Sequence, residues 1–109
     1  MRSLVFWVLA PAMAFAEPAF EDAASAFPVQ HVYGGGWEHF VGGGIAVLDC
    51  NGDGWPDLFA AGGENPTNLF RNDSNAPGGP LAFSTVSIPE ITGVTGAYPI
   101  DIDGDGHVD

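Results

Sequence analysis

The chain has very little positive charge and almost no cysteine. Lys and Arg total 2 against 14 Asp and Glu in 109 residues, which gives a formal net charge of -12. Because such a surface repels polyanions, we expect no nucleic acid partner and no anionic membrane partner. The single cysteine, Cys50, excludes an internal disulfide framework. We expect Cys50 to be a free thiol, the alternative being a disulfide to a cysteine outside this sequence.

Long hydrophobic runs are also missing. The most apolar stretch lies within residues 4–15 and is shorter than the roughly 20 residues that span a bilayer. It follows Arg2 and ends in the small residues Ala14 and Ala16, a pattern typical of a signal peptide. We therefore expect a helical signal peptide at 1–16, cleaved after Ala16, and a mature protein that is secreted, periplasmic or held at the cell surface.

Sustained helical periodicity is absent after residue 16. The 16 Gly and 9 Pro divide the chain into short apolar runs separated by turn residues. Four of these runs predict short strands joined in a meander, at residues 44–48, 58–62, 68–72 and 81–88. The preceding segment, 17–43, contains two weaker strand candidates, at 18–24 and 29–33.

The sequence repeats itself after the first of these strands. GIAVLDCNGDGWPD at 44–57 aligns without a gap with GAYPIDIDGDGHVD at 96–109, so that Asp101 lies 52 positions after Asp49. A period of about 50 residues is typical of propeller blades, which have four strands each. We therefore expect an all-β fragment of a β-propeller, with a complete blade at 44–95 and the truncated start of a second repeat at 96–109. Pro99 makes the opening strand of that second repeat doubtful, because proline donates no ladder hydrogen bond.

Both copies contain an acidic loop in which oxygen-bearing residues alternate with glycine. In the first loop the candidate ligands are Asp49, Asn51, Asp53, the backbone carbonyl of Trp55, and Asp57. In the second they are Asp101, Asp103, Asp105, the backbone carbonyl of His107, and Asp109. Calcium binds such flexible arrays of oxygen atoms, and its charge would offset the repulsion between neighbouring carboxylates. The pattern predicts one Ca²⁺ site per loop. The charge count predicts tighter binding in the second loop, which has four carboxylates rather than three, if that site is complete.

Other uses of these residues fit less well. An EF-hand requires Glu at loop position 12, where the first loop has Ala60. Acidic Gly-rich loops can also be solvated turns, but two copies in register argue against this. His31, His39 and His107 are too scattered in the sequence to indicate zinc, and we expect them to be surface or packing residues. Catalytic carboxylates face each other across a cleft, whereas these converge on one centre, so we do not expect an enzyme.

The order GGGIAVLDCNGDGWPDLFAAGGENPTNLFRND, FSTV, TGV and DIDGDGHVD resembles the FG-GAP or VCBS-type repeats of integrin-alpha-like β-propellers. Within this group it is most similar to secreted bacterial relatives of cartilage acidic protein. The resemblance implies a ring of several four-stranded blades with calcium held in some of the hairpin loops, and it identifies this sequence as an N-terminal fragment. One blade buries little apolar surface by itself, so we expect the fragment to be marginally stable.

The resemblance implies a secreted calcium-binding module with a structural or adhesive role, or one that interacts with extracellular protein or carbohydrate. The alternative is that the repeats form the non-catalytic propeller of a larger secreted enzyme, one that degrades polysaccharide or lipid and carries its catalytic domain elsewhere. Because propellers host both binders and enzymes, the fold does not separate the two.

Overall fold

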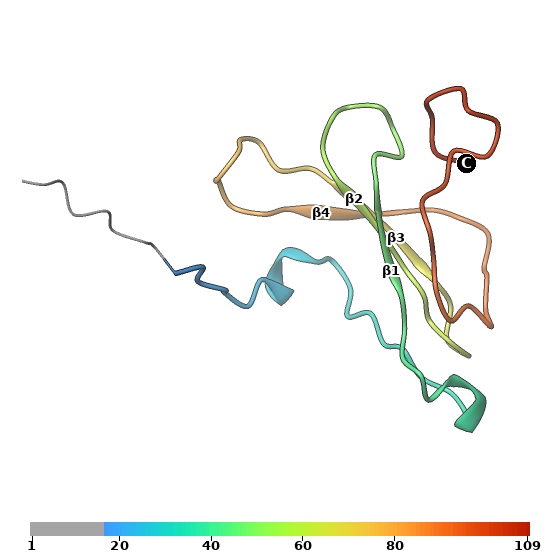
Figure 1. Ribbon diagram of the computed structural model, residues 1–109. Coiled ribbons are helices and arrows are strands. Elements are labelled where there is room, and N and C mark those ends of the chain that lie inside the picture. Colours follow the sequence, from blue (N-terminus) through green and yellow to red (C-terminus); the bar gives the residue numbers. More distant parts are fainter. Residues whose placement is uncertain (1–16) are drawn as a thin grey trace, which may run out of the picture.

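A computed structural model describes residues 17–109, so the expected signal peptide at 1–16 lies outside the described residues. One antiparallel sheet has its four strands in the order β1-β2-β3-β4 (Figure 1). The strands are β1 (Ile45–Leu48), β2 (Asp57–Ala60), β3 (Asn68–Asn72) and β4 (Phe83–Val86). Two short 3-10 turns, η1 (Ala24–Ala26) and η2 (Trp37–His39), precede the sheet. The expected all-β class and four-stranded meander are confirmed, and the sheet has the form of one propeller blade.

The strand bounds follow the apolar runs closely. Strand β3 has the expected bounds, β1 and β4 lie within theirs, and β2 begins one residue earlier because Asp57 pairs with Leu48. This pairing closes a hairpin whose connection is the first acidic loop. Among the described residues, no helix is long and apolar enough to cross a membrane.

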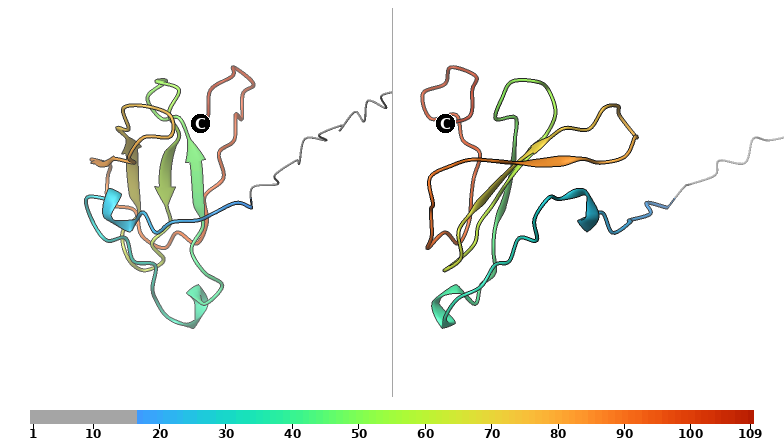
Figure 2. Two further views of the ribbon diagram at one scale, coloured as in Figure 1. Left: turned by 90° about the vertical axis from the view of Figure 1, so that its left-hand side faces the viewer. Right: turned by 180° about the vertical axis from the view of Figure 1, so that it is seen from behind.

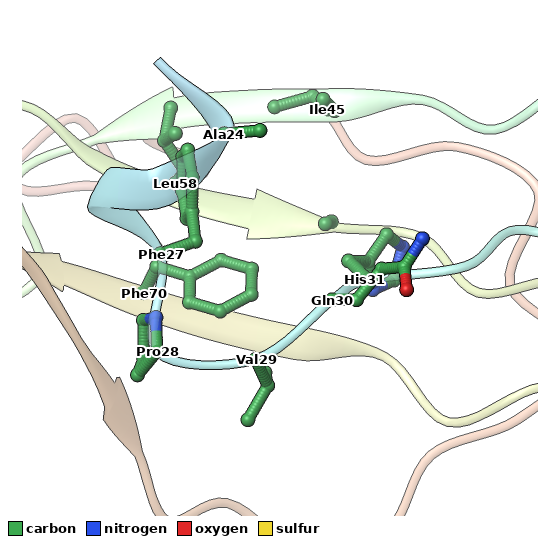
Figure 3. Close-up of a pocket in the computed structure, with 10 residues that line it drawn as sticks. Ala24, Phe27, Pro28, Val29, Gln30, His31, Ile45, Leu58 and Phe70 are labelled. Carbon is green, nitrogen blue, oxygen red and sulfur yellow. The ribbon is translucent and has the colours of Figure 1, made fainter.

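The N-terminal segment lies over one face of the sheet rather than along its edge. The ring of Phe27 stacks on Phe83 and meets Phe70 edge-on, with centroids 4.6 and 5.0 Å apart. The Nε2–H of His31 donates to the Ala61 carbonyl at 2.7 Å, and the Asn68 amide donates to His31 Nδ1 at 2.8 Å. Figure 3 shows Phe27 and His31 above β2 and β3, where they line an apolar pocket.

The two weaker strand predictions, at 18–24 and 29–33, are wrong. Residues 24–26 form η1, and residues 29–33 form no strand. A segment that crosses a face cannot form ladder hydrogen bonds with the strands beneath it, and only Gly34 makes a single bridge, to Gly63. His31 is therefore anchored through its side chain rather than its backbone.

The core of the sheet is small. The buried apolar residues are Ala46, Ala60, Ala61 and Phe70, while large side chains such as Ile45 and Val47 are more than half exposed. Four polar residues are buried as well: Asp57, Thr67, Asn72 and Ser74. A blade with so little buried apolar surface depends strongly on its polar contacts, and most of the buried polar groups lie near the first acidic loop and the end of β3.

Residues 95–100 run beside β1 without forming a strand (Figures 1 and 2). The Gly44 N–H donates to the Thr95 carbonyl at 3.2 Å, and a Cβ on Gly44 would come within 2.8 Å of Gly96 Cα. Pro99 has no N–H to donate to such a ladder. This path places the second acidic loop next to the first, at the same end of the sheet (Figure 2).

Candidate metal centre

Asp49 organises the first acidic loop. Its Oδ1 accepts hydrogen bonds from the N–H groups of Gly52 at 2.8 Å and Asp53 at 3.1 Å, and its Oδ2 accepts one from Gly54 at 2.8 Å. The chain can bend around one carboxylate in this way because Gly52 and Gly54 have φ of 75° and 83°, a region that disfavours side chains. The first carboxylate of the motif thus shapes the loop in addition to being a candidate ligand.

The next two oxygen-bearing residues make shorter turns. Asn51 Oδ1 accepts the Asp53 N–H at 3.2 Å, and Asp53 Oδ1 accepts the Trp55 N–H at 2.8 Å. The Asn51 amide also donates to Asp53 Oδ2 at 2.8 Å. This alternation of side-chain acceptor and backbone donor explains why polar residues occur at every second position of the loop.

The second loop repeats this geometry 52 residues later. Asp101 accepts from the N–H groups of Gly104, Asp105 and Gly106 at 2.7, 3.1 and 2.8 Å. Asp103 accepts from Asp105 at 3.1 Å, and Asp105 accepts from His107 at 2.9 Å. The repeat seen in the sequence is therefore also a repeat of backbone conformation, including positive φ at both loop glycines.

Three of the predicted ligands in the second loop lie together. One carboxylate oxygen from each of Asp101, Asp103 and Asp109 lies within 4.8 Å of the other two, while Asp105 is outside this group. In the first loop the three carboxylates of Asp49, Asp53 and Asp57 do not form such a group, and Asn51 occupies the position of Asp103. Calcium binds oxygen ligands at roughly 2.3–2.6 Å, so the all-oxygen donor set and its spacing in the second loop fit that ion.

Asp57 differs from the other candidate ligands because it is fully buried. Its Oδ2 accepts the Cys50 N–H at 2.8 Å, and its Oδ1 accepts the Asn72 N–H at 2.7 Å. The Asn72 side chain in turn donates to the Pro56 carbonyl at 3.1 Å. Asp57 thus ties the acidic loop to the end of β3. Asn72 was not predicted as part of the site, although it lies in the NLFRN run that carries the family resemblance.

Hydrogen bonds donated by the backbone amides of each loop keep its first carboxylate ionised. The Gly54 N–H, followed by other loop amides, lowers the pKa of Asp49 below its ordinary value, and Gly106 does the same for the pKa of Asp101. A lowered pKa means that the carboxylate form is favoured in the folded loop and is lost only as the pH falls through the acidic range. Both residues are therefore negatively charged acceptors at neutral pH.

Cys50 is expected to react slowly with alkylating agents. Loss of solvation and the Asp57 carboxylate raise the pKa of its thiol from 9.0 to about 11, although the residue as a whole is exposed. Only the thiolate reacts, and its smaller fraction near pH 8 is partly offset by its greater nucleophilicity. The rate with iodoacetamide should therefore be about tenfold below that of a small model thiol in calcium-free buffer. Rates measured from pH 7 to 10 would test this, and a plateau below pH 9 would contradict it.

The fold and the paired acidic loops define a β-propeller-type repeat. Residues 49–109, more than half of the chain, match the family model described as FG-GAP-like repeat. The chain belongs to this family, whose repeats are non-catalytic modules. No curated protein and no solved structure matches the chain.

Proposed function

We propose that the chain is a calcium-stabilised extracellular repeat module with a structural or adhesive role toward protein or carbohydrate. The observation that supports this proposal is the repetition of one loop conformation at Asp49 and Asp101. A single loop of this kind could be a solvated turn. Two loops with the same set of carboxylate-to-amide hydrogen bonds indicate that the function depends on this loop conformation. The ligands of the proposal are those predicted above.

The donor set favours calcium over other ions. The side-chain candidates offer oxygen atoms only, and zinc would favour nitrogen or sulfur ligands as well. Extracellular calcium-binding modules have dissociation constants of ~10⁻⁴ to 10⁻³ M, which suits a compartment rich in calcium. The signal-like N-terminus supports export to such a compartment, and the narrower relation to secreted relatives of cartilage acidic protein is part of the same proposal.

Calcium is expected to bind the full chain and to raise its resistance to heat. Because the ion offsets repulsion among the loop carboxylates only in the folded state, the melting temperature should begin to rise as calcium approaches the dissociation constant and then increase with the logarithm of its concentration. Calorimetric titration and thermal melting with CaCl₂ measure the two effects, with MgCl₂ as the control because magnesium needs a stricter octahedral arrangement. A flat isotherm up to several millimolar calcium would refute the proposal.

A further inference from the structure

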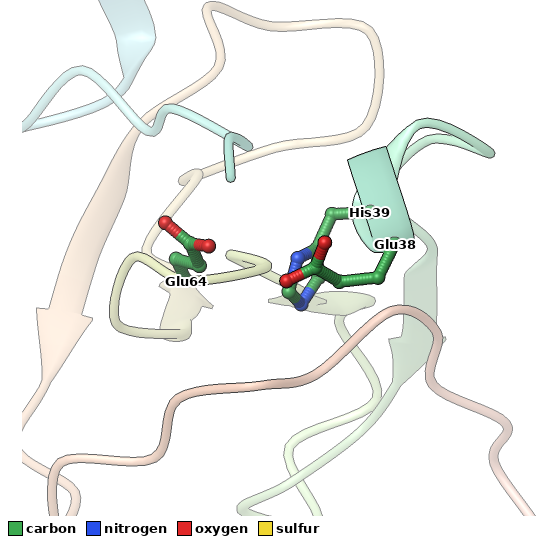
Figure 4. Close-up of side chains that lie close together, drawn as sticks. All are labelled: Glu38, His39 and Glu64. Carbon is green, nitrogen blue, oxygen red and sulfur yellow. The ribbon is translucent and has the colours of Figure 1, made fainter. Parts of the chain in front are cut away.

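A second group of metal-binding side chains lies away from the acidic loops. Glu38 and His39 belong to η2, before β1, and Glu64 belongs to the turn between β2 and β3. One ligand atom from each residue lies within 4.8 Å of the other two, and Figure 4 shows the three side chains gathered between the two segments. His39 was predicted to be a surface or packing residue because the three histidines are scattered in the sequence. Its neighbour Glu64 is 25 positions away, and no local spacing connects the two.

The three side chains are close without bonding to one another. Among residues 17–109, no hydrogen bond or ion pair joins any two of them, and the only ion pair is Arg71 with Asp73. His39 Nδ1 is buried and has no hydrogen-bond partner. Around a tetrahedral zinc ion with bonds of about 2.0–2.1 Å, neighbouring ligand atoms lie roughly 3.4 Å apart. A small inward movement of the flexible glutamates would therefore complete the site.

The backbone around the cluster is built for close approach. Glu64 Oε1 accepts the Gly36 N–H at 3.0 Å, and the Glu64 N–H donates to the Gly34 carbonyl at 2.9 Å. Gly35 has φ of 142°, and a Cβ there would meet His39 Nδ1 at 2.7 Å and the Glu64 side chain at 2.9 Å. Glycine is thus required where the chain passes the imidazole and the carboxylate.

We propose that Glu38, His39 and Glu64 form a zinc site that fastens the loop before β1 to the β2–β3 turn. An imidazole nitrogen with two carboxylates is a donor set for zinc-class ions rather than calcium, and three protein ligands leave a fourth position for water. The site is independent of the proposed calcium loops, because the predicted ligand atoms of those loops are all oxygens and include no imidazole nitrogen. Its effect is to cross-link two segments that otherwise meet only through glycine backbone and single side-chain contacts.

Zinc binding by the full chain tests this proposal. The protein is stripped with EDTA, supplied with millimolar calcium to occupy the acidic loops, and titrated with zinc against a chromogenic chelator. One zinc ion per chain is expected. His39→Ala and Glu38→Gln should each weaken binding by about tenfold or more, because each removes a ligand. Glu90→Gln, which removes an exposed carboxylate elsewhere, should leave the affinity unchanged.

Two further measurements keep the result clear. Glu38 is exposed and has no hydrogen bond among the described residues, so Glu38→Gln can weaken zinc binding without unfolding the chain. Replacing zinc by cobalt should give visible absorption bands of a four- or five-coordinate ion, and these bands should vanish in His39→Ala. The proposal is overturned if zinc does not bind stoichiometrically in the presence of calcium, or if Glu90→Gln lowers the affinity as much as His39→Ala.

Discussion

Replacing Asp57 by Asn is expected to lower the free energy of unfolding of the chain by about 2–4 kcal/mol. The Asp57 carboxylate is fully buried and accepts one backbone N–H through each oxygen, from Cys50 and from Asn72. An amide of the same shape has a single acceptor oxygen, so its NH₂ group would face one of these donors. That donor would lose its partner and be left buried beside a second donor, a costly arrangement inside a protein.

Urea unfolding followed by tryptophan fluorescence measures this effect, with Asp53→Asn as the matched control. Asp53 is also a predicted ligand, but it is exposed. Asp57→Asn should lower the urea midpoint both with calcium and with EDTA, whereas Asp53→Asn should lower it only with calcium. If Asp57→Asn matched the wild type in EDTA, Asp57 would be a ligand alone and not the tie between the loop and β3.

Local features of this chain could be predicted from its sequence. The strands follow apolar runs bounded by turn residues. The loops follow a motif in which most acceptors serve a donor two to five residues away, as Asp49 does for Gly54. Such contacts depend on nearby residues only, so the pattern of the sequence contains them. The repeat at 52 residues then predicted that both loops would share one conformation.

Contacts between distant segments could not be predicted in this way. The apolar residues of 29–33 have strand-like composition, but Phe27 and His31 find better partners on the face of the sheet, on Phe70 and Ala61. Tertiary packing therefore overrides the local preference for a strand. The same holds for the meeting of His39 with Glu64, which depends on the path of the glycine-rich segment at 34–36 and leaves no sequence signature.

The burial of Asp57 could not be predicted from the sequence either, and it links the acidic loop to the sheet. The motif identifies position 9 of the loop as a ligand, but the structure adds that β2 begins there and that Asn72 of β3 donates to it. An ion bound in the first loop would therefore be coordinated by the same carboxylate that joins the loop to β3. We expect calcium in this loop to stabilise the blade more than its exposed position suggests.

The last prediction concerns the first carboxylate of each loop. Asp49→Asn and Asp101→Asn should each abolish one calcium site, with a loss of affinity of about 100-fold or more in the altered loop, since each change removes a ligand charge and disturbs the loop that holds the others. Each carboxylate uses both oxygens to accept three backbone N–H groups. An amide cannot satisfy all three donors, so the bend around it should open.

Calorimetric titration of the two variants separates the loops. The wild type should bind two calcium ions, and each variant should bind one, with the tighter site lost in Asp101→Asn because the second loop has four carboxylates. Glu90→Gln, an exposed acidic residue outside both loops, removes one charge and should change neither site. If Glu90→Gln weakened calcium binding as much as Asp49→Asn, the ion would be responding to the overall charge of -12 rather than to ordered loops.

A reciprocal exchange of one residue between the loops extends this test. Asn51→Asp should tighten the first site and Asp103→Asn should weaken the second, because these positions account for the difference in carboxylate number.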